Sequence, residues 1–273
     1  MDAFTSLPSL FGFSQACYLH LPKIAFSMAT ILSLYMNALL NIGFPMNIKK
    51  FVANKARPLP VIIMADTSGS MSVDGKIDSL NQSLRDMTKS FSQESRSRAE
   101  INVAVITFGG QAQVHLDLTP AHQIEQIQEL NATGGTPLGQ ACILAKELIE
   151  DKEIIPGRAY RPVIILLSDG HPTDDYSTAF GELVNSERAQ KATRFALSIG
   201  ADADDRILGD FGNDIEAPLF HARNASEIHR FFRAVTMSVA NHSKSQSPNQ
   251  PVKLDFAEVA EGELVEDDFE LDF

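Results

Sequence analysis

Runs of apolar residues alternate with amphipathic segments over most of the chain. The runs VIIMA at 61–65 and PVIILL at 162–167 are uninterrupted, which is typical of strands that are buried on both faces of a sheet. The segment 76–91 instead repeats its apolar residues at helical spacing, which predicts an amphipathic helix. The pattern as a whole predicts strands at 61–65, 101–108, 111–116, 162–167, 194–200 and 218–222, and helices at 76–91, 121–129, 136–149, 178–193, 204–210 and 225–240.

The order of these elements predicts an α/β domain at residues 58–240. Continuous apolar strands that alternate with helices indicate a doubly wound, mostly parallel, Rossmann-like sheet with helices on both faces. The segment 111–116 is the exception, because it follows the tight turn Gly109-Gly110. We therefore expect it to be an antiparallel edge strand that forms a hairpin with the strand before it.

Composition narrows the class of function. The chain has 273 residues, of which 44% are hydrophobic, so it can bury a sizeable core. Its formal charge of -12 argues against a protein that grips nucleic acid through phosphate contacts, and against electrostatic docking on an anionic membrane. The two cysteines, Cys17 and Cys142, lie far apart and outside any CxxC motif. A disulfide framework and a thiolate zinc site are therefore not expected.

The N-terminal segment 1–57 allows two interpretations. Residues 24–44 carry no charge and are long enough to span a bilayer as a helix, at about 1.5 Å per residue. The basic residues that follow, at 49–57, would then leave the main domain in the cytoplasm, anchored at the inner membrane. Alternatively, Met46 resembles an ordinary cytosolic start, and the preceding residues are an overlong gene start. Both interpretations predict a cytoplasmic domain, and a membrane contact only through 24–44.

The C-terminal segment 241–273 combines a polar linker with an acidic tail. The linker is NHSKSQSPNQP, and nine acidic residues follow from Asp255 onward. This composition favours a disordered tail. Apolar residues such as Phe256 and Phe269 are interleaved with the acidic ones. The tail could therefore dock on a partner or on its own domain, where one of its carboxylates could cap a metal ion.

Three polar motifs follow the predicted strands or enter a predicted helix. They are DTSGS at 66–70, TGGTP at 133–137 and SDG at 168–170. In an open α/β sheet, ligands bind outside the carboxyl ends of the strands, near the point where the strand order reverses. Carboxylates and hydroxyls are hard oxygen donors, which suit an octahedral Mg²⁺ or Mn²⁺ that keeps some of its waters. The motifs together predict a metal site.

Each motif taken alone has a plainer explanation. Ser, Thr and Asp are also the preferred residues of helix N-caps and turns. Three residues that follow the last motif, His171, Asp174 and Asp175, could line the rim of the site or belong to a surface turn. Cys142 lies on an apolar helix face and is expected to be a buried structural thiol.

At these motifs the sequence resembles the von Willebrand factor A domain family, over about two thirds of the chain. The metal-ion-dependent adhesion site of that family uses a DxSxS loop, a distant Thr and a distant Asp. The resemblance implies that Ser68, Ser70 and Thr136 contact the ion directly. It implies that Asp66 and Asp169 act largely through coordinated water.

Within that family, the motifs DTSGSM, TGGT and LLSDGHPTD are most similar to bacterial TerY-type proteins of tellurium-resistance and stress gene clusters. The resemblance implies a metal-dependent interaction module and not an enzyme, in which the ion accepts an Asp or Glu carboxylate from a partner protein. A metal-assisted hydrolase or phosphatase is the alternative, although the chain has no GxSxG motif and no second set of carboxylates for a two-metal site. A membrane-tethered scaffold that uses residues 24–44 is a third hypothesis.

Overall fold

The computed structural model describes residues 56–94, 96–213 and 219–254. The hydrophobic segment 24–44 and the acidic residues from 255 onward lie outside the described residues. Among the helices that are described, none combines the length and the apolar character needed to cross a membrane.

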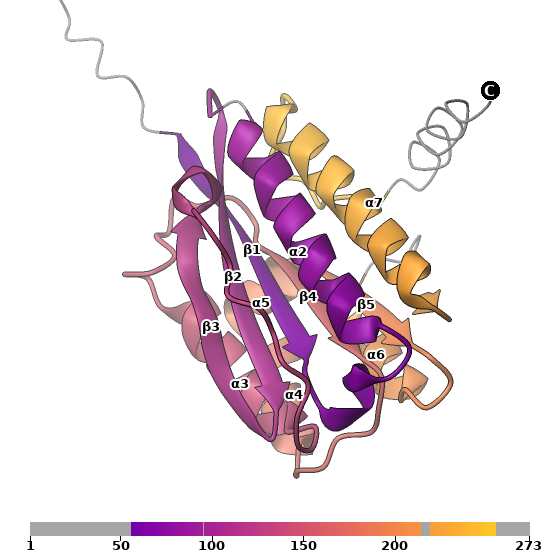
Figure 1. Cartoon of the computed structure of the whole chain (residues 1–273). Coiled ribbons are helices and arrows are strands. Elements are labelled where there is room, and N and C mark those ends of the chain that lie inside the picture. Colours follow the sequence, from indigo (N-terminus) through magenta and orange to yellow (C-terminus); the bar gives the residue numbers. More distant parts are fainter. Residues whose placement is uncertain (1–55, 95, 214–218, 255–273) are drawn as a thin grey trace, which may run out of the picture. The chain divides into compact units, whose positions relative to one another are not determined.

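Within the described residues, six strands form one sheet in the order β3-β2-β1-β4-β5-β6. Every neighbouring pair is parallel except β2 and β3, and β3 is the antiparallel edge strand expected from the sequence (Figure 1). The strands are β1 (Arg57–Asp66), β2 (Ala99–Gly109), β3 (Gln111–Pro120), β4 (Val163–Ser168), β5 (Thr193–Ile199) and β6 (Phe220–Ala222). The predicted doubly wound, mostly parallel sheet is thus confirmed.

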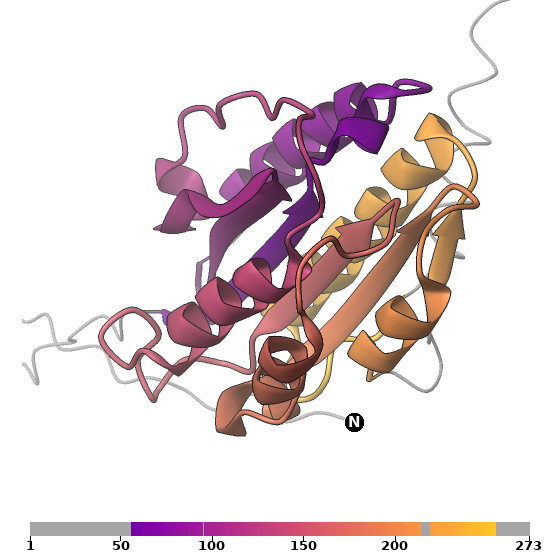
Figure 2. The same cartoon turned by 90° about the horizontal axis from the view of Figure 1, so that it is seen from below.

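Helices cover both faces of this sheet (Figure 2). The helices are α2 (Lys76–Gln93), α3 (Leu138–Glu150), α4 (Ser177–Val184), α5 (Glu187–Lys191), α6 (Asp205–Phe211) and α7 (Ala225–Lys244). Helices α2 and α7 lie side by side on one face, and the others lie on the opposite face. Along β1, Val61 and Ile63 belong to the core cluster under α2 and α7, whereas Ile62 and Met64 belong to the cluster on the other face. Because both faces are covered, β1 reads as a continuous apolar run.

The strand order reverses between β1 and β4, which are adjacent and parallel. From β1 the chain crosses through α2 to β2, which lies next to β1 and away from β4. From β4 it crosses to β5, which lies next to β4 and away from β1. The connections therefore diverge at the carboxyl ends of these two strands, where Asp66 ends β1 and Ser168 ends β4. This is the switch point at which α/β sheets bind ligands.

The predicted helix at 121–129 is wrong. The structure has only a short 3-10 turn, Ala121–Gln123, and the chain then runs without regular structure along α2. The side chain of Asn81 in α2 makes two hydrogen bonds to the backbone of Leu130, at 3.0 Å to its carbonyl and at 2.8 Å from its N–H. These bonds, together with the burial of Ile127 and Leu130, hold the segment against α2.

The single helix predicted at 178–193 is divided into α4 and α5. Ser186 stands between them in an extended conformation and accepts a hydrogen bond from the Ala189 N–H. A serine in this position caps a new helix rather than continuing the previous one.

The chain rejoins the domain after α7. This helix continues to Lys244, past the boundary expected at residue 240. Val252 is then buried in the core beneath α7, and its N–H donates to the Thr193 hydroxyl at 3.1 Å. Thr193 is the first residue of β5, so Val252 lies at the end of the sheet where the parallel strands begin.

Candidate metal centre

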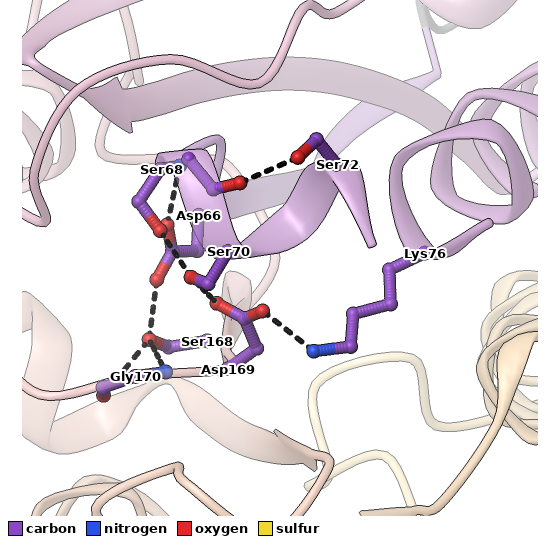
Figure 3. Close-up of polar contacts among 9 residues, drawn as sticks. Asp66, Ser68, Ser70, Ser72, Lys76, Ser168, Asp169 and Gly170 are labelled. Carbon is purple, nitrogen blue, oxygen red and sulfur yellow. Dashed lines mark hydrogen bonds and ion pairs between the residues drawn. The ribbon is translucent and has the colours of Figure 1, made fainter. Parts of the chain in front are cut away.

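The Asp66 carboxylate is fixed between the two central strands. Asp66 is fully buried, and its Oδ1 accepts a hydrogen bond from the Ser68 N–H at 2.8 Å. Its Oδ2 accepts a hydrogen bond from the Ser168 hydroxyl, which lies at the end of β4, at 2.5 Å. The first bond closes the turn after β1, and the second ties this turn to β4 (Figure 3).

A chain of polar contacts continues from this turn to the loop after β4. The hydroxyls of Ser68 and Ser70 are 3.0 Å apart, and Ser70 Oγ donates to Asp169 Oδ1 at 2.6 Å. The other carboxylate oxygen of Asp169 accepts from Lys76 Nζ at 2.8 Å. Figure 3 shows these side chains converging from two loops and from the first turn of α2.

Thr136 borders the same small space from a third loop. A β-carbon built on Gly170 would lie 3.8 Å from the Ser70 hydroxyl oxygen and 3.9 Å from the Thr136 hydroxyl oxygen. The backbone of Thr136 is held by Thr173, because its N–H donates to Thr173 Oγ1 and its carbonyl accepts from the Thr173 N–H, both at 2.9 Å. The five residues predicted from the sequence thus lie on three loops at one edge of the sheet.

Backbone contacts join these loops. The Gly69 N–H donates to the Gly134 carbonyl at 2.9 Å, and the Thr133 N–H donates to the Thr67 carbonyl at 2.7 Å. Gly134 has a φ of 69°, and a β-carbon there would lie 2.5 Å from the Cα of Gly110. Only glycine meets both conditions without strain. The loop that carries Thr136 is therefore held close both to the loop after β1 and to the turn between β2 and β3.

Asp174 fixes the start of α3, directly after Thr136 and Pro137. Its carboxylate accepts hydrogen bonds from the Gly139 N–H at 3.0 Å and the Gln140 N–H at 3.1 Å. These are backbone groups of the first turn, which have no partner inside the helix. From the sequence, Asp174 could either line the rim of the site or belong to a surface turn. In the structure it caps the start of α3 from a loop that is distant in the sequence.

Comparisons with known proteins identify the domain that carries this edge. Residues 61–171, which include all three loops, match the family model described as von Willebrand factor type A domain. The chain contains a von Willebrand factor type A (VWA) domain. A search of curated proteins found no significant match.

Solved structures agree on the fold of this VWA domain. A von Willebrand factor type A protein from Catenulispora acidiphila matches with a TM-score of 0.54 and 20% identity, over 67% of this chain and 43% of that one. Proximal thread matrix protein 1 from the mussel byssus matches with a TM-score of 0.52 and 18% identity, over 66% and 46%. The pilus adhesin SpaC from Lactobacillus rhamnosus GG matches with a TM-score of 0.55 and 14% identity, over 68% and 30%. The match thus spans less than half the length of each of these chains.

Lys76 is a further residue of this centre, and none of the three sequence motifs includes it. Its side chain is only 17% exposed, and it forms an ion pair with Asp169, whose side chain is fully buried. Lysine in the first turn of a helix is unfavourable with respect to the helix dipole, which favours anions there. A lysine at the start of the predicted helix at 76–91 was therefore a signal that a carboxylate lies nearby.

Burial sets the electrostatics of the centre. Desolvation raises the pKa of the Asp66 carboxyl from 3.8 to about 6, although the hydrogen bonds from Ser168 and Ser68 lower it. The carboxylate of Asp169 contributes a smaller increase. Two buried carboxylates this close to each other favour a nearby positive charge, and Lys76 supplies one.

The donor set fits a hard divalent cation. The two carboxylates and the three hydroxyls of the predicted site are oxygen ligands, which Mg²⁺ and Mn²⁺ prefer. The hydroxyls can turn their lone pairs to an ion, because a serine or threonine oxygen both donates and accepts. Among the described residues, no group of three or more His, Cys, Asp or Glu side chains is placed to hold a metal. A centre at this edge would therefore depend on the hydroxyl oxygens.

The remaining candidates lie apart from this chain of contacts. His171 has a side chain that is 72% exposed and faces Asp204 at 3.3 Å. Cys142 is fully buried in the core under α3, and burial raises the pKa of its thiol to about 12. A thiol with so high a pKa stays protonated at neutral pH, as expected of a structural cysteine.

Proposed function

We propose that this VWA domain is an interaction module, not an enzyme, which binds Mg²⁺ or Mn²⁺ and through it a carboxylate of a partner protein. One observation supports the proposal above all. Two buried carboxylates, those of Asp66 and Asp169, meet the hydroxyls of Ser68, Ser70 and Thr136 at the switch point of the sheet. Among these five residues, Ser70 is the exposed one.

When bound, the ion would supply a Lewis-acidic position that can accept an Asp or Glu carboxylate from outside. The residues around the site would hold its ligands in place. Asp66 is fixed by its bonds to Ser68 and Ser168, and Thr136 is fixed by its backbone pairing with Thr173. A site on such fixed loops loses little entropy when a ligand binds.

A hydrolytic role has less support. A metal-assisted hydrolase needs a general base or a second metal near the ion. His171, the histidine that follows Asp169 in the sequence, lies exposed on the surface beside Asp204. The hydroxyls of Ser68 and Ser70 contact each other and a carboxylate, and no histidine partner contacts them within the described residues.

The metal is tested first, by calorimetric titration of Mg²⁺ or Mn²⁺ into the full chain. Thr136→Ala should weaken binding by at least about tenfold, which corresponds to the loss of one ligand worth ~1.4 kcal/mol. Thr133→Ala is the matched control, because it removes an exposed threonine hydroxyl from the same loop. Equal affinity in wild type and Thr136→Ala would overturn the assignment of the metal ligands.

The carboxylate is tested with defined probes. Paired peptides that differ only by Asp against Asn, or Glu against Gln, are immobilised, and the full chain is passed over them in Mg²⁺ or in EDTA. We expect retention on acidic peptides in Mg²⁺ alone, and its loss in the double variant Ser68→Ala plus Ser70→Ala. Retention that is indifferent to EDTA would place recognition elsewhere. Metal-dependent turnover of generic phosphoesters, lost in Asp66→Ala, would favour the hydrolase instead.

The proposed biological system and cellular location are supported by the sequence alone. A role in a stress or tellurium-resistance system rests on the likeness of DTSGSM, TGGT and LLSDGHPTD to TerY-type proteins. The cytoplasmic location and a membrane tether through 24–44 rest on the charge pattern of the N-terminal segment. We propose them on that basis.

A further inference from the structure

A second polar site lies at the other end of the strands from the proposed metal centre, where β4 and β5 begin. It is a pocket of about 380 Å³, lined by residues around the end of α3, the start of β4 and helix α5. These segments precede β4 and β5, whereas the metal centre follows β1 and β4. Because β5 spans seven residues at about 3.3 Å each, roughly 20 Å separate the two edges.

The acidic side chains of this pocket are already engaged. Glu187 pairs with Lys191 at 2.9 Å, and that contact lowers the pKa of the Glu187 carboxyl. Glu150 accepts a hydrogen bond from the Arg188 N–H at 2.8 Å. The guanidinium of Arg188 donates to two backbone carbonyls, at 2.9 and 2.6 Å.

Two basic side chains of the pocket have no acidic partner within ion-pair distance among the described residues. Lys152 and Arg161 are both exposed, and neither forms an ion pair within the described residues. Arg57 and Arg158 lie next to this pocket, since Arg57 Nε donates to the Arg158 carbonyl and its guanidinium stacks on the ring of Tyr160, a lining residue, 4.0 Å from the centroid. Lys152 and Arg161 thus offer two basic side chains to solvent at this pocket, in a chain whose net charge is -12.

The chain itself arrives at this pocket. Asn249 is one of its lining residues, and three residues later Val252 is buried against the first residue of β5. The last described residue, Leu254, packs against the same core cluster. The segment 255–273 begins directly after it, and its 19 residues include nine acidic ones and no basic one.

We propose that the pocket is the docking site of the chain's own acidic segment 255–273, held by Lys152 and Arg161. Charge complementarity and the point of departure support this occupant. The first acidic residues, Asp255 and Glu258, follow Asn249 by six and nine residues, at up to about 3.5 Å per residue of extended chain. Near the tether, the effective concentration of these carboxylates is of millimolar order. The metal centre is a full strand length farther away, so capping of the metal by this segment is less favoured.

Zero-length carbodiimide cross-linking of the full chain tests this proposal, because it joins a lysine amine to a carboxylate only where the two are in contact. We expect cross-links from 255–273 to Lys152 and Lys191 at least fivefold above those to Lys89, an exposed lysine outside the pocket. They should be lost in 1 M NaCl, where charge interactions are screened within about 3 Å. Peptide mapping by mass spectrometry gives the yields.

A charge-reversal pair adds a second readout. Lys152→Glu plus Arg161→Glu should reduce the cross-links to Lys191 at least fivefold. Lys89→Glu plus Arg206→Glu is the matched control, since it makes the same change of net charge at two exposed residues outside the pocket. Cross-links spread evenly over the exposed lysines, or gathered on Lys76, would overturn the proposal. So would cross-links that join light to ¹⁵N-labelled chains in an equal mixture, because they would assign the docked segment to a second copy.

Discussion

Among single residues, Lys76 is the one whose role bears most directly on metal binding. Its ammonium group pairs with Asp169 at 2.8 Å and supplies the positive charge that the buried carboxylates favour. A divalent ion would bring positive charge to the same carboxylate. Lys76 and a bound metal would therefore compete for Asp169, although water around the partly exposed amine would weaken this competition.

Replacing Lys76 by methionine should raise the affinity for Mg²⁺ by roughly tenfold, or ~1.4 kcal/mol, because the competing charge is removed. It should also destabilise the metal-free protein, which then holds two buried carboxylates without a counter-charge. Calorimetric titration and urea unfolding in EDTA measure the two effects. Lys89→Met is the control, since it makes the same change on an exposed face of α2. Unchanged or lower affinity in Lys76→Met would show that the lysine does not compete.

Asp66 gives the metal-free protein a defined pH dependence. Its pKa is about 6 in the folded chain against 3.8 in the unfolded one, so the folded chain binds the proton more tightly. The stabilising contribution of this proton is complete below pH 3.8 and is lost as the pH rises through about 6, by roughly 3 kcal/mol in all.

Asp66→Asn should therefore raise the free energy of unfolding in EDTA at pH 7.5 and remove this slope between pH 5 and 7.5. The amide still accepts from the Ser68 N–H, and it can donate to Ser168 Oγ. Urea unfolding at the two pH values is the measurement. Asp117→Asn, at an exposed position of β3, should leave the slope unchanged. If Asp66→Asn is less stable than wild type at pH 7.5, burial of the Asp66 charge does not destabilise the folded chain.

At the level of elements, the segment after β3 depends on a side chain from another element. Asn81→Ala leaves the N–H and the carbonyl of Leu130 without their buried partner. We expect a loss of about 2–4 kcal/mol in the free energy of unfolding, from two unsatisfied buried groups. Urea unfolding in EDTA measures it, with Gln82→Ala on the exposed side of α2 as control. An equal, small effect of both variants would mean that Asn81 does not hold this segment.

The contrast between these elements explains what the sequence could predict. The apolar run of β1 and the spacing of apolar residues in α2 are local patterns, and they predict the elements correctly because burial follows the same pattern. The segment after β3 also has apolar residues near helical spacing, but its backbone is held by Asn81, which lies 49 residues away from Leu130. A partner so distant leaves no local signal.

For the candidate site the same limit applies. The three motifs stand at strand ends or helix starts, so the order of elements was enough to predict that they gather at one edge. The family resemblance then picks out the five oxygen-bearing residues within them. The contact of Lys76 with Asp169 and the cap that Asp174 provides for α3 link residues 93 and 35 positions apart. Such pairs follow from the tertiary structure and not from a motif.

For the molecule as a whole, metal binding at the proposed centre would be linked to the stability of the entire domain. Its ligands come from three loops that meet only when β1, β4 and α3 are assembled, so the unfolded chain offers no comparable site. A ligand that binds the folded state alone stabilises it by about 2.7 kcal/mol when present at 100 times its dissociation constant. The pocket at the other edge of the sheet contains none of these ligands.

Saturating Mg²⁺ should therefore raise the thermal unfolding midpoint of the full chain, by roughly 5–10 °C for a domain of about 200 residues. Thr136→Ala should lose most of this increase, because it keeps the fold but lacks one ligand. Lys152→Glu plus Arg161→Glu should keep the increase in full, because these residues lie at the opposite edge of the sheet. Calorimetric scans in EDTA and in Mg²⁺ make the comparison. An equal increase in wild type and Thr136→Ala would mean that Mg²⁺ stabilises the protein at some other site, and the ligand set at Asp66, Ser68, Ser70, Thr136 and Asp169 would have to be abandoned.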